Sequence, residues 1–317
     1  QLSNEQFEFR KGKSTTVTVV SLVDMIMEEI ECRNHTMSVF LDLSKAFDCV
    51  DHSILLDRLG SHGIRGVPLK WLSSFLSHRS QVVQISNQLS KPIELRYGVP
   101  QGSILSPVLF LLYVNDIGSS LLHGGLVQYA DDTTLCFSAR SSEVLEQQAF
   151  VDINNCVQYF QSLNLTTNSS KSNVLNFALR DVGNHCGSAV LLADSTLEEV
   201  LSSKFLGIHL DRGLTWNEHI NHVCAKISSG IYVLRSLAKY CPSQVLITAY
   251  YGLIYPHLSY RVVLWGACAS SQFQRAFKLQ KKAIRIIAKI KFRESCRQAF
   301  KELQLLTLPC LYILETT

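Results

Sequence analysis

The chain has 317 residues, of which 47% are hydrophobic and 18% are charged, and its formal net charge is +4 at pH 7. This composition is typical of a globular protein with two or three subdomains, and it excludes a disordered or low-complexity chain. The ten cysteines lack the spacing of a disulfide framework, so we expect reduced thiols in an intracellular protein.

The N-terminal part predicts a helix followed by a strand that ends in an acid. Apolar residues at helical spacing predict a helix over residues 14–33, and an apolar run predicts a strand over residues 39–43, which contains Asp42. A carboxylate at the end of a buried strand costs free energy unless a metal ion or a donor satisfies it. The alternative is a helix cap, but Asp48 or Asp51 can cap the next helix, leaving Asp42 without an obvious structural role.

Two short helices are predicted near residues 54–59 and 69–76, followed by the segment Gly98-Val-Pro-Gln-Gly-Ser103. Glycines let a backbone approach a substrate closely, whereas Ser103 can also act as the N-cap of the helix that follows. The apolar stretch over residues 104–117 is too short to span a membrane, so it predicts a buried helix.

The dipeptide Asp131-Asp132 is the most informative point of the chain. β-Branched and aromatic residues on both sides, within residues 127–137, predict two strands joined by a turn at Ala-Asp-Asp. Two carboxylates at such a turn suit a divalent cation such as Mg²⁺. Paired acids are also common in turns for conformational reasons alone, so the pair does not establish a site by itself.

The second half of the chain becomes increasingly helical and basic. We expect a helix over residues 143–163, strands over 172–178 and 204–210 that complete one sheet, and then mainly helices. Residues 235–301 contain 13 of the 30 Lys and Arg residues but a single acid, Glu294. Within this part an apolar helical face lies beside a basic stripe, which is either a solvated surface or a contact for nucleic-acid phosphates; the stripe consists of Arg275, Lys278, Lys282, Arg285 and Lys289.

Two other patterns do not reach a functional motif. Gly12-Lys13-Ser14 resembles the end of a phosphate-binding loop, but Phe7 stands where that loop requires glycine. His219 and His222 are three residues apart, yet no Cys-x-x-Cys accompanies them, so a zinc site is not indicated.

Three segments in a fixed order resemble the catalytic core of a reverse transcriptase from a non-LTR retrotransposon of the LINE-like or jockey-like kind. They are Phe40-Leu-Asp-Leu-Ser-Lys-Ala-Phe-Asp48, Gly98-Val-Pro-Gln-Gly-Ser103 and Tyr129-Ala-Asp-Asp132. Residues 6–15, 165–174 and 204–211 extend the resemblance over nearly the whole chain. It implies an α+β right-hand polymerase with a palm sheet backed by helices, partial fingers and a helical thumb. The implied domains are residues 1–36 as a fingers remnant and entry helix, 37–212 as a palm with an inserted fingers segment at about 53–97, and 213–317 as a basic thumb with a C-terminal extension.

The resemblance also implies a role for individual residues. Asp42 and Asp131 would bridge two Mg²⁺ ions, with Mn²⁺ as an alternative, and Asp132 would be a conditional ligand. Lys171, forty residues after the pair, would protonate the leaving pyrophosphate. Phe47 would be the steric gate against ribose, or otherwise a core residue. Arg10, Gln101 and Gly102 would bind nucleotide, Phe205, Leu206 and Gly207 would form the primer grip, and the basic stripe would contact nucleic-acid backbone.

The implied partners are an RNA template, a DNA primer and dNTPs, and no membrane is implied. The implied assembly is a ribonucleoprotein that acts in the cytoplasm and the nucleus.

Two positions depart from the family pattern, because Glu8 and Arg261 stand where glycine is usual. A side chain that replaces glycine at positive φ costs stability. We also expect a fragment of a longer polyprotein, from the start at Gln1 and the missing upstream fingers. The alternative function is therefore an inactive retroelement relic that only binds nucleic acid, and a metal-dependent nuclease is a third, less supported reading.

Overall fold

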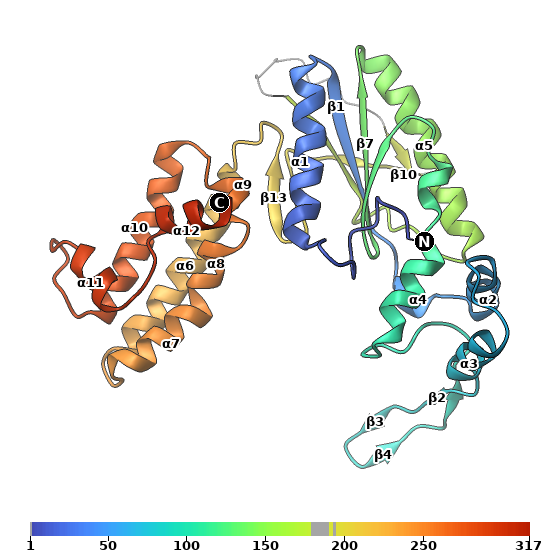
Figure 1. Ribbon diagram of the computed structural model, residues 1–317, viewed down its shortest axis with the longest axis horizontal. Coiled ribbons are helices and arrows are strands. Elements are labelled where there is room, and N and C mark those ends of the chain that lie inside the picture. Colours follow the sequence, from blue (N-terminus) through green and yellow to red (C-terminus); the bar gives the residue numbers. More distant parts are fainter. Residues whose placement is uncertain (1, 179–189, 193–194) are drawn as a thin grey trace. The chain divides into compact units, whose positions relative to one another are not determined.

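The structure, a computed structural model, describes residues 2–178, 190–192 and 195–317. The chain divides into two compact units, Gln1–Ser203 and Lys204–Thr317. The first unit contains a mixed sheet with helices, and the second unit is mainly helical (Figure 1).

A five-stranded sheet forms the centre of the first unit, in the order β11-β8-β1-β7-β6. Strand β1 is central and pairs antiparallel with both β7 and β8. The strands predicted from the sequence around Asp42, on both sides of the acid pair and over 172–178 are confirmed. The bounds are β1 (His35–Leu41), β6 (Gly125–Tyr129), β7 (Asp132–Ala139), β8 (Asn173–Phe177) and β11 (Glu198–Glu199).

Helices cover both faces of this sheet. Met37, Val39 and Leu41 of β1 point into a core shared with helices α4 (Leu105–Val114) and α5 (Ser142–Ser162). Helix α1 (Thr15–Glu31) packs on β1, β6 and β7 outside that core, so it lies on the opposite face, as Figure 1 shows. The hydroxyl of Ser14 caps α1 by accepting from the Val17 amide, in agreement with the predicted helix.

A buried carboxylate of α5 holds the loop that leads into β6. Asp152 accepts hydrogen bonds from the backbone amides of Leu122 at 2.9 Å, His123 at 2.9 Å and Gly124 at 2.7 Å. Bonds from three amides to one carboxylate satisfy donors that burial would otherwise leave unpaired. The start of the acid-bearing hairpin is therefore fixed to the helix behind the sheet.

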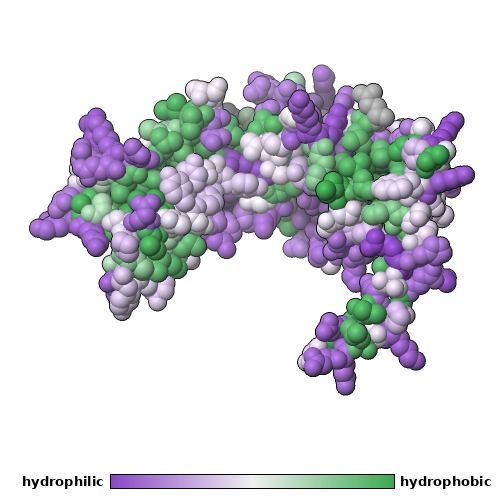
Figure 2. Space-filling view, turned by 60° about the horizontal axis from the view of Figure 1, so that its bottom comes forward, coloured by the Kyte–Doolittle hydropathy of each residue, from purple (hydrophilic) through white to green (hydrophobic). Residues whose placement is uncertain are grey.

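The segment predicted as a fingers insertion contains two helices and a long hairpin. Asp51 caps the first helix by accepting from the amides of Ser53 at 2.9 Å and Ile54 at 3.1 Å, so this acid and not Asp42 has the capping role. Apolar side chains of the hairpin, among them Ile85 and Leu89, are exposed. Figure 2 shows hydrophobic surface, in green, on the protruding hairpin. The elements are α2 (His52–Ser61), α3 (Val67–Leu76), β2 (Ser80–Gln81) paired with β5 (Ile93–Glu94), and β3 (Gln84–Ile85) paired with β4 (Gln88–Leu89).

The expectation that residues 204–210 form one more strand of the central sheet is wrong. They form a separate pair, β12 (Ser202–Phe205) and β13 (Ile208–Asp211). The chain reverses between these strands because Leu206 and Gly207 have left-handed φ angles of 45° and 84°, which an extended strand does not allow. Strand β11 occupies the sheet edge instead.

The second unit consists of helices packed around α6 (Asn217–Leu237), against which β13 and α10 (Ser270–Ile287) lie. This unit begins at Lys204, before the predicted start of the thumb at residue 213. The assignment of palm and thumb stays a prediction. Among the described residues, no helix is long and apolar enough to cross a membrane. The remaining elements are α7 (Ser243–Leu253), α8 (Tyr255–Ser259), α9 (Val262–Trp265), α11 (Arg297–Glu302), α12 (Leu308–Thr316), the short helices η1 (Ala46–Asp48) and η2 (Ile117–Ser120), and the pair β9 (Leu191–Leu192) and β10 (Ser195–Thr196).

Candidate active site

The order and register of the strands bring the predicted catalytic residues together. Leu41 pairs with Thr133, so Asp42 at the end of β1 lies beside Asp132 at the start of β7. On the other side Phe40 pairs with Asn173, which places Asp42 beside Lys171. The ammonium nitrogen of Lys171 is 3.7 Å from Oδ2 of Asp42. The carboxylate of Asp42 is thus flanked by residues that lie up to 129 positions away from it in the sequence.

The backbone around Asp42 is fixed by the loop that precedes β8. The amide of Asp42 donates to Oγ of Ser172 at 3.0 Å, and its carbonyl accepts from the Asn168 amide at 2.8 Å. Within the described part of the chain, Oδ2 of Asp42 has no hydrogen-bond partner although it is closed to solvent. The ammonium of Lys171, 3.7 Å away, pairs with the charge of this oxygen without a hydrogen bond, so its lone pairs are left to accept a cation.

A buried glutamine ties the N-terminal segment to the turn that carries the acid pair. Oε1 of Gln6 accepts from the amides of Ala130, at 3.3 Å, and Glu8, at 3.1 Å. Ala130 has a φ of 54°, so the turn before Asp131 adopts a conformation that alanine rarely takes. Sequence reasoning missed this role of Gln6, because a pairing over 124 residues leaves no local pattern.

Four carboxylates influence one another at this end of the sheet. Loss of hydration, followed by repulsion from Asp131 and Asp42, raises the pKa of Asp132 to about 6. The pKa of Asp131 is also raised, mainly by burial and then by the charge of Asp42. Glu8 joins this group, since burial and the charges of Asp131 and Asp132 raise its pKa to about 7. Accumulated negative charge of this kind favours binding of a cation.

The donors fit a hard divalent ion in chemistry, because they are carboxylate oxygens. In the described residues, however, no three His, Cys, Asp or Glu side chains stand close enough to hold one ion together. Asp42, Asp131 and Asp132 are the carboxylates that would hold such an ion at this end of the sheet. Binding would also offset the repulsion that raises the pKa values of Asp131 and Asp132.

The two departures from the family pattern have different structural consequences. Arg261 has a φ of 51°, so the predicted cost of replacing glycine at positive φ applies to it. Glu8 is not among the residues with positive φ, whereas its neighbour Phe9 has a φ of 50°. The effect of Glu8 is thus electrostatic and not a backbone strain.

The glycines of the predicted nucleotide loop are required by the backbone. Gly98 has a φ of 86°, and a Cβ atom there would lie 2.9 Å from the carbonyl oxygen of Asp48. The backbone of Gly98 therefore packs closely against the protein's own backbone at Asp48. Gly102 has a φ of 85° with open space around it, so its conformation alone favours glycine. Oγ of Ser103 accepts from the Leu105 amide at 3.2 Å, which supports the first turn of α4.

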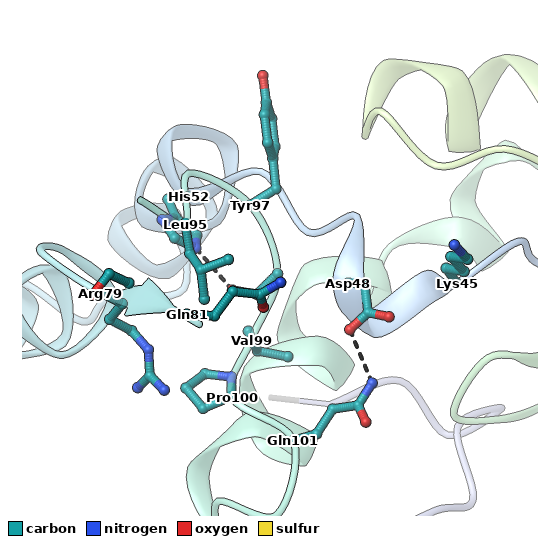
Figure 3. A pocket seen from close by; sticks show the side chains of 12 residues that line it. Lys45, Asp48, His52, Arg79, Gln81, Leu95, Tyr97, Val99, Pro100 and Gln101 are labelled. Atoms are coloured by element: carbon teal, nitrogen blue, oxygen red, sulfur yellow. Dashed lines mark hydrogen bonds between the residues drawn. The ribbon is translucent and has the colours of Figure 1, made fainter. Parts of the chain in front are cut away.

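Gln101 and Phe47 lie on neighbouring parts of this region. Nε2 of Gln101 donates to Oδ1 of Asp48 at 2.9 Å, as Figure 3 shows. The ring of Phe47 stacks on Phe110 with centroids 4.4 Å apart, and it is half-buried against the core. Core packing of Phe47 is therefore present, and its role as a steric gate stays a prediction.

Arg10 points back into its own segment. Its guanidinium donates to the carbonyls of Ser3 and Gln6 and contacts Oδ1 of Asn4. These bonds fix the N-terminal loop, and the nucleotide-binding role of Arg10 stays a prediction.

The predicted primer grip is the turn between β12 and β13. The carbonyl of Leu206 accepts a bond of 2.7 Å from the hydroxyl of Tyr260, and it also accepts from the guanidinium of Arg261. Two donors from the junction between α8 and α9 thus hold this turn, which contains Gly207 and follows Phe205.

Most of the predicted basic stripe lies on α10, but Lys289 lies outside it, since the helix ends at Ile287. A cavity of about 530 Å³ is lined by Arg275, Lys278, Lys282 and Arg285, together with Lys281, which the sequence pattern did not single out. Arg285 also lies over the ring of Phe292, 5.7 Å from its centroid. The helix therefore presents five cations on one hollowed surface.

Comparison with known proteins agrees with this arrangement. The family model described as "Reverse transcriptase (RNA-dependent DNA polymerase)" matches residues 1–210. The chain is 29% identical over 294 residues to the probable RNA-directed DNA polymerase from transposon X-element of Drosophila melanogaster, covering 89% of this chain and 31% of that protein. It is 27% identical over 305 residues to the RNA-directed DNA polymerase from mobile element jockey of the same species, covering 89% and 32%. The chain thus spans about a third of the length of these relatives.

Among solved structures, apo telomerase from Candida tropicalis matches with a TM-score of 0.49 and 11% identity, over 95% of this chain and 50% of that one. The sheet and helices confirm the predicted α+β class of a right-hand polymerase. Since the family model covers well over half of the residues, this chain belongs to the reverse transcriptase (RNA-dependent DNA polymerase) family.

Proposed function

We propose that this chain is the polymerase domain of a non-LTR retrotransposon protein, which extends a DNA primer on an RNA template. The observation that carries the proposal is the convergence of Asp42, Asp132 and Lys171 on one end of the sheet, next to Asp131. Relatives that are named RNA-directed DNA polymerases support it over 89% of the chain.

In this proposal Asp42 and Asp131 hold two Mg²⁺ ions, or Mn²⁺ in their place, and Asp132 is a conditional ligand. Such ions, when bound, neutralise charge on the attacking and leaving oxygens of an in-line displacement. In the same proposal Lys171 gives a proton to the leaving pyrophosphate, which its ion pair with Asp42 supports, and Phe47 excludes a ribose 2′-hydroxyl. The remaining catalytic contribution is positioning, since phosphoryl transfer needs no covalent bond to the protein.

The cations of α10 are proposed to contact template and primer phosphates. Contacts to phosphate carry affinity without sequence preference and weaken as salt rises. The proposed partners are an RNA template, a DNA primer and dNTPs, within a ribonucleoprotein that contains the element RNA. Its proposed places of action are the cytoplasm and the nucleus.

Primer extension on an RNA template in Mg²⁺ tests the proposal. We expect Asp131→Asn to abolish extension while template-primer binding is retained, because the substitution removes a ligand charge without changing shape. Asp57→Asn, an exposed acid on α2, is the matched control and should leave extension unchanged. Normal extension by Asp131→Asn would refute the assignment.

A second candidate function is a nucleic-acid-binding relic without turnover. The observation that favours it is Glu8, a fourth negative charge at the site where a nucleotide triphosphate would enter. Salt-sensitive RNA binding without any incorporation, even with Glu8→Gly and with an upstream segment of a relative joined to the chain, would select this alternative.

A further inference from the structure

A cavity beside the catalytic loops shares Gln101 with the predicted nucleotide site, but its other lining residues have no role in the proposal above. It has a volume of about 680 Å³ and is formed by residues of η1 and α2, by the base of the β2–β5 hairpin and by the loop before Gln101 (Figure 3). This volume is in the range of cavities that hold one small organic ligand. It shares η1 with Phe47, so it adjoins the proposed nucleotide site.

The charges that line the cavity favour an anion. Lys45 and Arg79 lie on opposite sides of it in Figure 3, and within the described residues neither has a carboxylate within 4 Å. The one acid in the lining is Asp48, and its carboxylate already accepts the amide of Gln101 at 2.9 Å. Nε2 of His52 is bonded to the carbonyl oxygen of Gly98 at 2.8 Å. Arg79 also lies over the ring of Phe75, 5.8 Å from its centroid. Two positive charges thus face one negative charge in the lining, and the excess of positive charge favours a phosphate.

The rim of the cavity offers an aromatic surface. Tyr97 is 56% exposed, and Figure 3 shows its ring standing outward above Val99 and Pro100. Backbone pairing with Asp51 fixes the position of this residue while leaving its ring uncovered. An exposed aromatic ring beside cations is the combination with which proteins bind unpaired nucleotides, by stacking on the base and by charge on the phosphate.

We propose that this cavity binds one nucleotide of an unpaired nucleic-acid strand, with the base on Tyr97 and the phosphate between Arg79 and Lys45. The inference rests on the proposed function, in which the template is single-stranded before it is copied. A paired base is not available for stacking on a side chain, so a duplex does not fit this lining.

A strand fits the surroundings better than a free nucleotide. Arg79 and Gln81 stand at the base of the hairpin whose exposed apolar residues include Val82 and Val83, at 49% and 56% exposure. This surface continues from the cavity along the chain and gives neighbouring bases further contacts. A free nucleotide would leave these side chains unused.

Photo-crosslinking and binding in EDTA test the proposal without any need for catalysis. A short RNA that contains 5-iodouridine is expected to crosslink to Tyr97, as identified by mass spectrometry. By fluorescence anisotropy, Tyr97→Leu should weaken binding of this RNA by about tenfold, since stacking of one base contributes that much. Arg79→Gln should also weaken binding, because it removes a phosphate contact, and it should make binding less dependent on salt. Tyr97→Phe keeps the ring and should bind like the unchanged chain.

Lys91→Gln is the matched control, because Lys91 is an exposed cation of the same hairpin segment that does not line the cavity. An equal loss in Lys91→Gln and Arg79→Gln would overturn the proposal in favour of unspecific charge attraction. Crosslinks confined to other residues would overturn it too, as would full displacement of the RNA by a dNTP, which would indicate a free-nucleotide site. Unchanged thermal unfolding of the variants shows that folding is not the cause; Tyr97 and Lys91 are exposed, and Arg79 is half-buried.

The outcome separates this inference from the proposed function. A chain that crosslinks at Tyr97 but never extends a primer leaves the cavity proposal standing and refutes the polymerase. A chain that extends primers while Tyr97 and Arg79 have no effect on RNA binding refutes the cavity proposal alone.

Discussion

Lys171 and Asp42 form an ion pair across the junction of β8 and β1, with Nζ 3.7 Å from Oδ2. The side chain of Lys171 is 68% exposed, so the pair contributes little to stability. Its importance is positional, because it keeps an ammonium group beside a carboxylate that is proposed to hold a metal ion.

Substitutions of Lys171 distinguish a role of its positive charge from a role as proton donor. We expect Lys171→Met to slow single-turnover extension by about 10²-fold, the usual contribution of a general acid, with unchanged template-primer affinity. Lys171→Arg retains the charge but does not release a proton at neutral pH, so it should also be slow. Full activity of Lys171→Arg would show that only the charge matters.

Glu8→Gln is expected to stabilise the chain at pH 8 in EDTA by about 1 kcal/mol, after allowance for solvent screening. Burial and the charges of Asp131 and Asp132 raise the pKa of Glu8 from 4.5 to about 7 in the folded state. The protonated carboxyl of Glu8 therefore contributes fully to the stability of the folded state below pH 4.5. This contribution is lost as pH rises through 7. Urea unfolding at pH 8 and pH 4 measures the difference, with the exposed Glu28→Gln on α1 as control. A gain of equal size at both pH values would contradict this explanation.

Two substitutions of Arg261 test the cost of its backbone conformation. Both Arg261→Gly and Arg261→Ala lose the bond to the carbonyl of Leu206. Only glycine adopts the φ of 51° without strain, so the glycine variant should be more stable by about 1 kcal/mol in denaturant unfolding. Equal stability would mean that this segment relaxes to another conformation.

His219 makes the second unit sensitive to acid. It is 2% exposed, and burial, followed by the charges of His209, His222 and Arg261, lowers its pKa to about 3. The unfolded chain takes up this proton near pH 6.5, so stability is lost as pH falls below 6.5, by about 2 kcal/mol at pH 5. His219→Phe should remove this part of the pH dependence, as measured by thermal unfolding. The exposed His123→Gln should not, and a similar flattening in that control would rule His219 out.

Much of the local structure follows from sequence pattern alone. Ser14 marks the start of α1, and the acids of Tyr129-Ala-Asp-Asp132 stand at a turn between strands, as predicted. These predictions succeed because capping and strand pairing between neighbours depend on residues close in sequence. The prediction of one strand over residues 204–210 was wrong, because the chain turns at Leu206 with a positive φ. Leucine rarely adopts this conformation, and nothing in the composition indicates it.

The family, the acids at the ends of strands and the concentration of positive charge near α10 could be predicted from residue patterns. That Lys171 lies beside Asp42, that Gln6 holds the turn before Asp131, and that Glu8 adds its charge to the site became visible in the folded chain. These relationships depend on strand register, because pairing β1 between β7 and β8 places residues side by side that no local spacing relates. The same holds for the cavity at Tyr97, whose walls come from three separate segments of the chain.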